Sequence, residues 1–127
     1  MDPLEEQFEA LRRARYFAEG RIERRSDGSA LITIPNVPLP DGWNVRTTDV
    51  CFVVPVGYPV ARPDTFWADP DLRLGTTAMP ANTALNANYG GPAPRLWFSF
   101  HPSHWNPSVD TLLTFAKLVQ ARLREVR

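Results

Sequence analysis

Hydrophobic residues near the start of the chain recur at a helical spacing. Leu4, Phe8 and Leu11 lie three or four positions apart and would form one apolar stripe along a helix. Asp2 precedes the stripe, and an aspartate at that position can accept hydrogen bonds from the free N–H groups of the first turn. The pattern therefore predicts a helix over residues 2–19.

Apolar and β-branched runs in the next part of the chain predict strands. Asp27-Gly28 is a turn signal inside residues 21–34, which indicates a hairpin of two antiparallel strands. Residues 47–54 contain an uninterrupted apolar run, typical of a central strand that is covered on both faces. A shorter run at 65–67 adds another strand, so the pattern predicts about four antiparallel strands.

The second half of the chain is irregular at first and periodic at its end. Residues 69–95 are rich in proline, glycine and asparagine and predict a long irregular loop. Asn106 and Pro107 then provide a cap and a first helical residue. The apolar stripe of the predicted closing helix consists of Leu112, Ala116, Val119, Leu123 and Val126. This order indicates a single α+β domain over residues 1–127, with helices packed on one antiparallel sheet.

Charge and cysteine content narrow the possible functions. The 127 residues include 14 basic and 14 acidic side chains, so the formal net charge is zero. Nucleic-acid binding is not expected, because it needs a basic excess on one face. The single cysteine cannot form an internal disulfide, and no Cys/His cluster has zinc spacing. Without an N-terminal leader or a long apolar run, we expect a cytoplasmic protein that has no membrane association and no cofactor.

Two local motifs, in this order, carry a resemblance to a known family. A hydrophobic strand leads into Tyr58-Pro59 and then into residues 62–66, and Trp105-Asn106-Pro107 precedes the last helix. This arrangement resembles the ubiquitin-conjugating (E2-like, UBC) fold. More narrowly, the chain resembles the bacterial group called prokaryotic E2 family E in Leu39-Pro40-Asp41-Gly42-Trp43, Tyr58-Pro59, Pro63-Asp64, Trp97, Ser99, His101 and Trp105 through Asp110.

The resemblance implies a UBC-like fold and a role in a bacterial ubiquitin-like conjugation pathway. Members of this group are typically encoded beside an E1-like adenylating enzyme, a ubiquitin-like modifier and a deubiquitinase-like peptidase, some of them in antiphage islands. The implied partners are therefore an E1-like enzyme and a ubiquitin-like protein. In the family, basic residues of the first helix dock the E1 enzyme, which makes Arg12, Arg13 and Arg15 candidates. The other interpretation of these arginines is a solvated helix face.

The usual nucleophile of the family is missing. Its cysteine, which holds the modifier as a thioester, lies shortly before the W-x-P element, because a thiolate attacks readily and also leaves readily. Here residues 95–101 contain no cysteine, and the family distance counted back from Trp105 falls on Trp97. Cys51 lies in the middle of a predicted strand, where a free cysteine behaves as a small buried hydrophobe. The family's histidine-proline-asparagine triplet is also absent.

Two hypotheses for function remain. In the first, Ser99 accepts the modifier as an oxyester, and His101 or His104 acts as the general base that a hydroxyl needs at neutral pH. Ser99 and His101 are two positions apart, which in a strand places them on the same face. The amide that stabilises the oxyanion would come from Asn82, Asn86 or Asn88. In the second hypothesis, the protein is a catalytically inactive E2 variant that binds the modifier or the E1 enzyme.

A metal or hydrolase site is a third possible class of function. Two histidines and several carboxylates are available for it. His101 and His104 are three positions apart in a proline-flanked segment, however, and lack the helix that would aim both rings at one ion. We therefore expect no metal site among His101, His104, Asp64, Asp69, Asp71 and Asp110.

Overall fold

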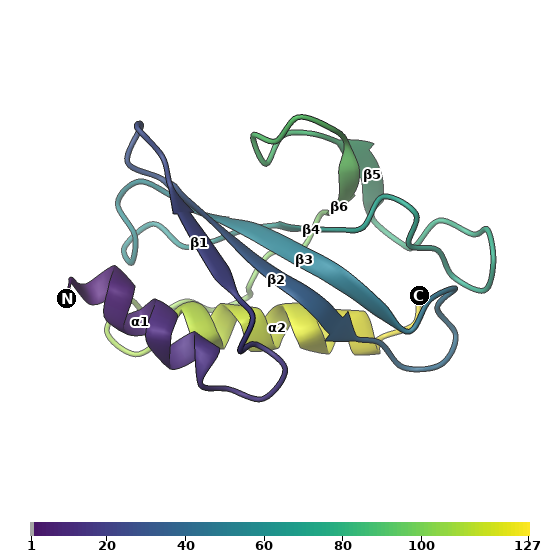
Figure 1. Ribbon diagram of the computed structural model, residues 1–127, viewed down its shortest axis with the longest axis horizontal. Coiled ribbons are helices and arrows are strands. Elements are labelled where there is room, and N and C mark those ends of the chain that lie inside the picture. Colours follow the sequence, from purple (N-terminus) through teal and green to yellow (C-terminus); the bar gives the residue numbers. More distant parts are fainter. Residues whose placement is uncertain (1) are drawn as a thin grey trace.

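The computed structural model describes residues 2–127 as two helices and one antiparallel sheet of six strands (Figure 1). The strand order across the sheet is β1-β2-β3-β4-β6-β5. The α+β class is confirmed, whereas the expected number of about four strands is wrong. The elements are α1 (Pro3–Arg12), β1 (Arg21–Arg24), β2 (Ala30–Pro38), β3 (Thr47–Val54), β4 (Phe66–Ala68), β5 (Thr83–Asn86), β6 (Arg95–Phe98) and α2 (Leu112–Arg124).

The main core lies between the sheet and the two helices, which run side by side along one face of the sheet (Figure 1). Phe52 of β3 meets Phe115 of α2 with ring centroids 4.8 Å apart. On the neighbouring strands, Phe66 stacks on Phe98 at 4.6 Å. Such aromatic contacts stabilise the core beyond the free energy gained from burying their area. The core thus fixes β4 and β6, the two strands that lead to the candidate site.

The first helix is shorter than predicted. Asp2 caps it as expected, since its Oδ1 accepts a hydrogen bond of 2.8 Å from the N–H of Glu5. The helix ends at Arg12, however, and residues 13–19 form successive turns that bury Phe17. The prediction of a helix to residue 19 is therefore wrong in its second half, because burial of Phe17 requires the chain to turn back toward the sheet.

The closing helix begins later than predicted. Its N-cap is Thr111, whose side chain forms a reciprocal capping box with Thr114. Asn106 instead caps a separate turn, since its Oδ1 accepts from the N–H of Ser108 at 3.0 Å. Its own N–H donates to Asp110 Oδ2 at 2.7 Å. The cap predicted at Asn106 is thus wrong, but four of the five residues of the predicted apolar stripe are buried in the core: Leu112, Ala116, Val119 and Leu123.

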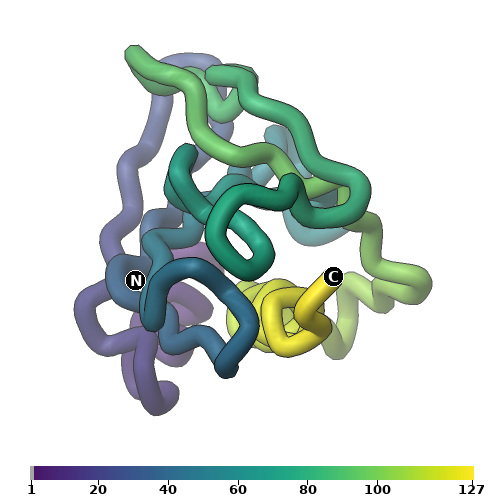
Figure 2. The backbone as a smooth tube through the Cα atoms, turned by 90° about the vertical axis from the view of Figure 1, so that its right-hand side faces the viewer, coloured from purple at the N-terminus to yellow at the C-terminus, as the bar shows by residue number. Residues whose placement is uncertain are grey.

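Residues 69–95 are less irregular than predicted. The segment contains β5, which pairs with β6 from Thr83↔Phe98 to Asn86↔Arg95. β5 lies at the edge of the sheet, and in Figure 2 the green turn that follows it is at the top, far from α2. No strand signal is visible in the sequence here because β5 is an edge strand with Ala84 and Leu85 exposed, so it has no alternation of buried and exposed positions.

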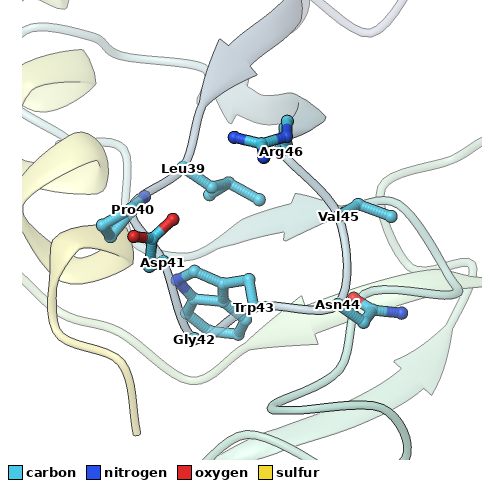
Figure 3. Close-up of a pocket in the computed structure, with 8 residues that line it drawn as sticks. All are labelled: Leu39, Pro40, Asp41, Gly42, Trp43, Asn44, Val45 and Arg46. Carbon is cyan, nitrogen blue, oxygen red and sulfur yellow. The ribbon is translucent and has the colours of Figure 1, made fainter.

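The loop between β2 and β3 is held to the end of α2 by one tryptophan. Residues 39–46 curl around a cavity of about 250 Å³, and the Trp43 indole lies on the side that faces the C-terminal helix (Figure 3). The indole is buried, and its Nε1 donates a hydrogen bond of 2.9 Å to the carbonyl of Leu123. That carbonyl belongs to the last turn of α2, where no intrahelical donor follows.

We expect Trp43→Phe to lower the free energy of unfolding by roughly 1–3 kcal/mol, because it leaves a buried carbonyl without its donor. Urea unfolding followed by circular dichroism measures this difference. Trp97→Phe is the matched control, since the half-buried Trp97 indole donates no hydrogen bond within residues 2–127. Equal losses in the two variants would show that the loss at position 43 reflects side-chain volume and not the hydrogen bond.

Candidate functional site

Ser99 follows directly after β6, at a point where the chain turns sharply. Its N–H donates to the carbonyl of Asn82 at 2.9 Å, and the next N–H, that of Phe100, donates back to Phe98 at 2.9 Å. This second bond spans only two residues and marks a tight turn centred on Ser99. The expectation that Ser99 and His101 share one face of a strand is therefore wrong, because the strand ends at Phe98.

Asn82 is the member of the three candidate asparagines that the structure places beside Ser99. It is exposed and adopts a left-handed backbone conformation, with φ of 59°. Within residues 2–127 its side-chain amide forms no hydrogen bond, so the amide is available to a ligand. Asn86 differs, because its Oδ1 already accepts from Trp67 Nε1 at 2.8 Å and from the N–H of Asn88 at 3.1 Å.

His101 is exposed and is oriented by a carboxylate. Its Nδ1 lies 2.8 Å from Oδ1 of Asp64, and Nε of Arg62 lies 3.7 Å from the same oxygen. With a carboxylate as its partner, Nδ1 carries a proton and Nε2 of the neutral ring is left to accept one. In the sequence, Asp64 stands in a family motif and is a candidate metal ligand or hydrolase residue, with no sign of a pairing with His101. The pairing was missed because 37 residues separate the two side chains.

The structure does not join Ser99 directly to either histidine. Among the hydrogen bonds of residues 2–127, none connects Ser99 Oγ with an imidazole. His104 is exposed and has no hydrogen-bonded partner within the same residues. The site therefore consists of two local pairs, Ser99 with Asn82 and His101 with Asp64, at neighbouring ends of β6 and β4.

A shallow groove adjoins the His101–Asp64 pair. It has a volume of about 140 Å³. Its walls combine apolar and aromatic side chains with one basic and one acidic group: Val53, Pro55, Arg62, Asp64, Thr65 and Trp67. Such a groove has room for about one or two glycine-sized residues of an extended chain beside the Asp64 carboxylate.

Cys51 lies in the middle of β3 and is completely buried, as expected from the sequence. Its register partners are Thr33 on β2 and Trp67 on β4. Burial raises the pKa of the thiol to about 11, because the charged thiolate is poorly solvated inside the protein. At neutral pH, Cys51 is therefore protonated and also out of contact with solvent.

We expect Cys51 in the folded protein to react with maleimide at least about a hundredfold more slowly than in urea, since only the accessible thiolate is nucleophilic. Because the thiol is fully buried, labelling requires the fold to open, so raising the pH toward 10 should speed the reaction by ionising the thiol in the opened molecules. Intact mass after timed labelling measures both rates. Rapid labelling of the native protein would contradict the buried position of the thiol.

The three arginines predicted to contact a partner differ in their surroundings. Arg12 lies in α1 and forms an ion pair of 3.4 Å with Glu9. Arg13 and Arg15 follow the end of the helix, are exposed, and have no carboxylate within 4.0 Å among the described residues. The latter two are therefore freer to bind an acidic group.

The carboxylates of the candidate metal site are dispersed. Across residues 2–127, no three His, Cys, Asp or Glu side chains gather closely enough to hold an ion. Asp69 accepts a hydrogen bond from the N–H of Asp49, and burial raises its pKa. Asp110 accepts from the N–H of Asn106.

Within residues 2–127, neither helix is long and apolar enough to cross a membrane.

The two sequence motifs that suggested a family lie against each other, since Trp105 Nε1 donates to the carbonyl of Pro59 at 2.8 Å. One comparison with known proteins gives a match: the family described as "Prokaryotic E2 family E" matches residues 13–126. This span contains both motifs, Ser99, and the His101–Asp64 pair. No curated protein and no solved structure matches the chain.

Proposed function

The chain belongs to prokaryotic E2 family E, and from this premise we propose that it receives a ubiquitin-like modifier from an E1-like enzyme and carries or positions it for transfer. The proposal includes a single UBC-like domain acting in the cytoplasm, in a bacterial conjugation pathway of the kind that some relatives use in antiphage defence. The family match over residues 13–126 is the observation that supports it.

We further propose that Ser99 is the acceptor. Its Oγ attacks the carbonyl carbon of the modifier's C-terminal glycine, which arrives as a thioester of the E1-like enzyme. Nε2 of His101 removes the hydroxyl proton, the C–S bond breaks, and the departing E1 thiolate takes up a proton. The product is a Ser99 oxyester. Asn82 lies opposite Ser99, because its carbonyl accepts from the Ser99 N–H. Its side-chain amide supplies a donor to the tetrahedral oxyanion.

The Asp64–His101 pair is the feature that favours this chemistry. A carboxylate that accepts from Nδ1 selects the tautomer with a basic Nε2 and stabilises the imidazolium formed on proton transfer. The hydrogen bond between base and hydroxyl would form when the modifier tail fills the groove, since catalytic hydrogen bonds are often long without substrate. Arg62 stands at the same groove and can pair with a backbone carbonyl of the tail.

The second candidate function is an inactive E2 variant that binds the modifier or the E1-like enzyme. The observation that favours it is the absence of a hydrogen bond between Ser99 and a histidine within the described residues, together with a buried and protonated Cys51. Under this proposal the same groove holds the modifier tail without a covalent step.

Intact mass distinguishes the two. The protein is incubated with its E1-like enzyme, the processed modifier and ATP, and the products are treated with thiol or with hydroxylamine. An oxyester resists thiol and is cleaved by hydroxylamine. Complex formation on gel filtration without a mass increase supports the binding variant, and a thiol-labile adduct would contradict the assignment of Ser99.

A further inference from the structure

A second cleft lies on the helical side of the molecule, away from Ser99. It forms where the turn after α1 approaches α2 (Figure 1) and has a volume of about 520 Å³. Its lining combines residues 14–17 of the turn with one face of the helix, because Lys117, Gln120 and Arg124 are spaced three and four positions apart. No acidic residue lines it.

Three cations line this cleft without a compensating charge. Arg15, Lys117 and Arg124 are all exposed, and none has a carboxylate within 4.0 Å among residues 2–127. Other basic residues of the chain do find partners: Arg12 pairs with Glu9, and Arg24 with Asp2. The protein has zero net charge, but a cleft with three cations and no carboxylate has a positive local potential, which attracts anions.

Tyr16 stands at the cleft in an unusual conformation. Its φ is 74°, a left-handed value that costs a residue with a side chain more than it costs glycine. The ring is 46% exposed, and the Arg15 guanidinium lies 4.7 Å from its centroid. Glycine would adopt this backbone conformation without strain, so the fold does not require a tyrosine at position 16. A strained and exposed aromatic side chain beside three cations therefore indicates a binding surface.

We propose that this cleft binds an acidic peptide segment of a partner protein. Carboxylates of the segment pair with Arg15, Lys117 and Arg124, and an apolar side chain of the segment packs on the Tyr16 ring. A peptide fits better than a lone anion, because the cations are spread over two elements and the exposed Tyr16 ring lines the same cleft. The inference does not depend on whether Ser99 carries a modifier.

The test is fluorescence anisotropy with a short labelled peptide that alternates glutamate and leucine, using the full chain. The same peptide with glutamine in place of glutamate is the ligand control. We expect Lys117→Glu/Arg124→Glu to weaken binding by about tenfold or more, since each exposed pair contributes modestly and reversal adds repulsion. Arg46→Glu, compared with Lys117→Glu alone, is the matched charge control. Arg46 is exposed, has no carboxylate within 4.0 Å among residues 2–127, and lies in the loop between β2 and β3. This control should change the affinity less than about twofold.

Binding should also weaken when salt is raised, since exposed charges are screened. Three results would overturn the proposal: equal binding of the glutamine peptide, equal loss in Arg46→Glu, or preference for a single-stranded oligonucleotide of similar length. Adduct formation by the double variant is measured in parallel, so that a failure here is distinguished from a failure of the modifier-carrier proposal.

Tyr16→Gly separates binding from folding. Glycine adopts positive φ without strain, so we expect the thermal midpoint to stay the same or rise, whereas the peptide should bind several-fold more weakly because the aromatic contact is lost. A drop in the thermal midpoint with unchanged peptide affinity would show that Tyr16 is a structural residue, and would remove it from the proposed surface.

Discussion

Replacing Ser99 by alanine is expected to abolish the covalent adduct with the modifier. The substitution removes the only atom that the proposed chemistry uses as a nucleophile, whereas it leaves the N–H that bonds to Asn82 in place. Because the side chain is half-buried at a turn outside the main core, the fold should change little in stability. Intact mass after incubation with the E1-like enzyme, modifier and ATP gives the result directly.

Cys51→Ala is the matched control for this experiment. It removes the one thiol of the chain, which is buried and has a pKa of about 11. The Cys51→Ala variant should form the adduct at the wild-type level. Its free energy of unfolding should fall slightly, because the sulfur is missing from the core. An adduct that survives Ser99→Ala and disappears in Cys51→Ala would reverse the assignment of the nucleophile.

Replacing His101 by glutamine is expected to slow adduct formation by about 10²–10⁴-fold, the usual contribution of a positioned general base. Glutamine keeps much of the volume, and its amide N–H can still donate a hydrogen bond to Asp64, but it cannot take the Ser99 proton. Single-turnover rates, measured with modifier-loaded E1 in excess, report this step. The E1 concentration that gives half of the maximal rate should remain close to that of the wild type, because the loss lies in the chemical step.

His104→Gln is the control at the neighbouring position. His104 is exposed and has no hydrogen-bonded partner within residues 2–127, so we expect less than a roughly threefold change. Asp64→Asn should fall between the two histidine variants, because Asp64 lines the groove but acts on the reacting atoms only through the orientation of His101. If His104→Gln had the larger effect, the general base would be His104.

The α+β class, the capping of α1 by Asp2, the apolar stripe of α2 and the burial of Cys51 followed from the sequence. Each depends on residues that are neighbours along the chain: a cap and the N–H three positions later, apolar side chains one turn apart, or a cysteine inside a continuous apolar run. The family motifs were readable for the same reason, since each is a short segment with fixed spacing.

The tertiary structure decided where those elements end and what the site contains. α1 stops at Arg12 because Phe17 has to reach the core, and α2 starts only at Leu112 because Asn106 is used by a separate turn with Asp110. The edge strand β5 has no buried face that a periodic pattern could reveal. Elements of this kind are set by contacts with distant parts of the chain.

The candidate site shows the same division most clearly. The sequence alone identified Ser99, His101 and His104 as chemically able residues, and it offered three asparagines and four aspartates without a means of choosing among them. The pairing of β5 with β6 brings Asn82 to Ser99, and the end of β4 brings Asp64 to His101. Residue type and local spacing determine which side chains can react, whereas packing of the sheet determines which of them meet.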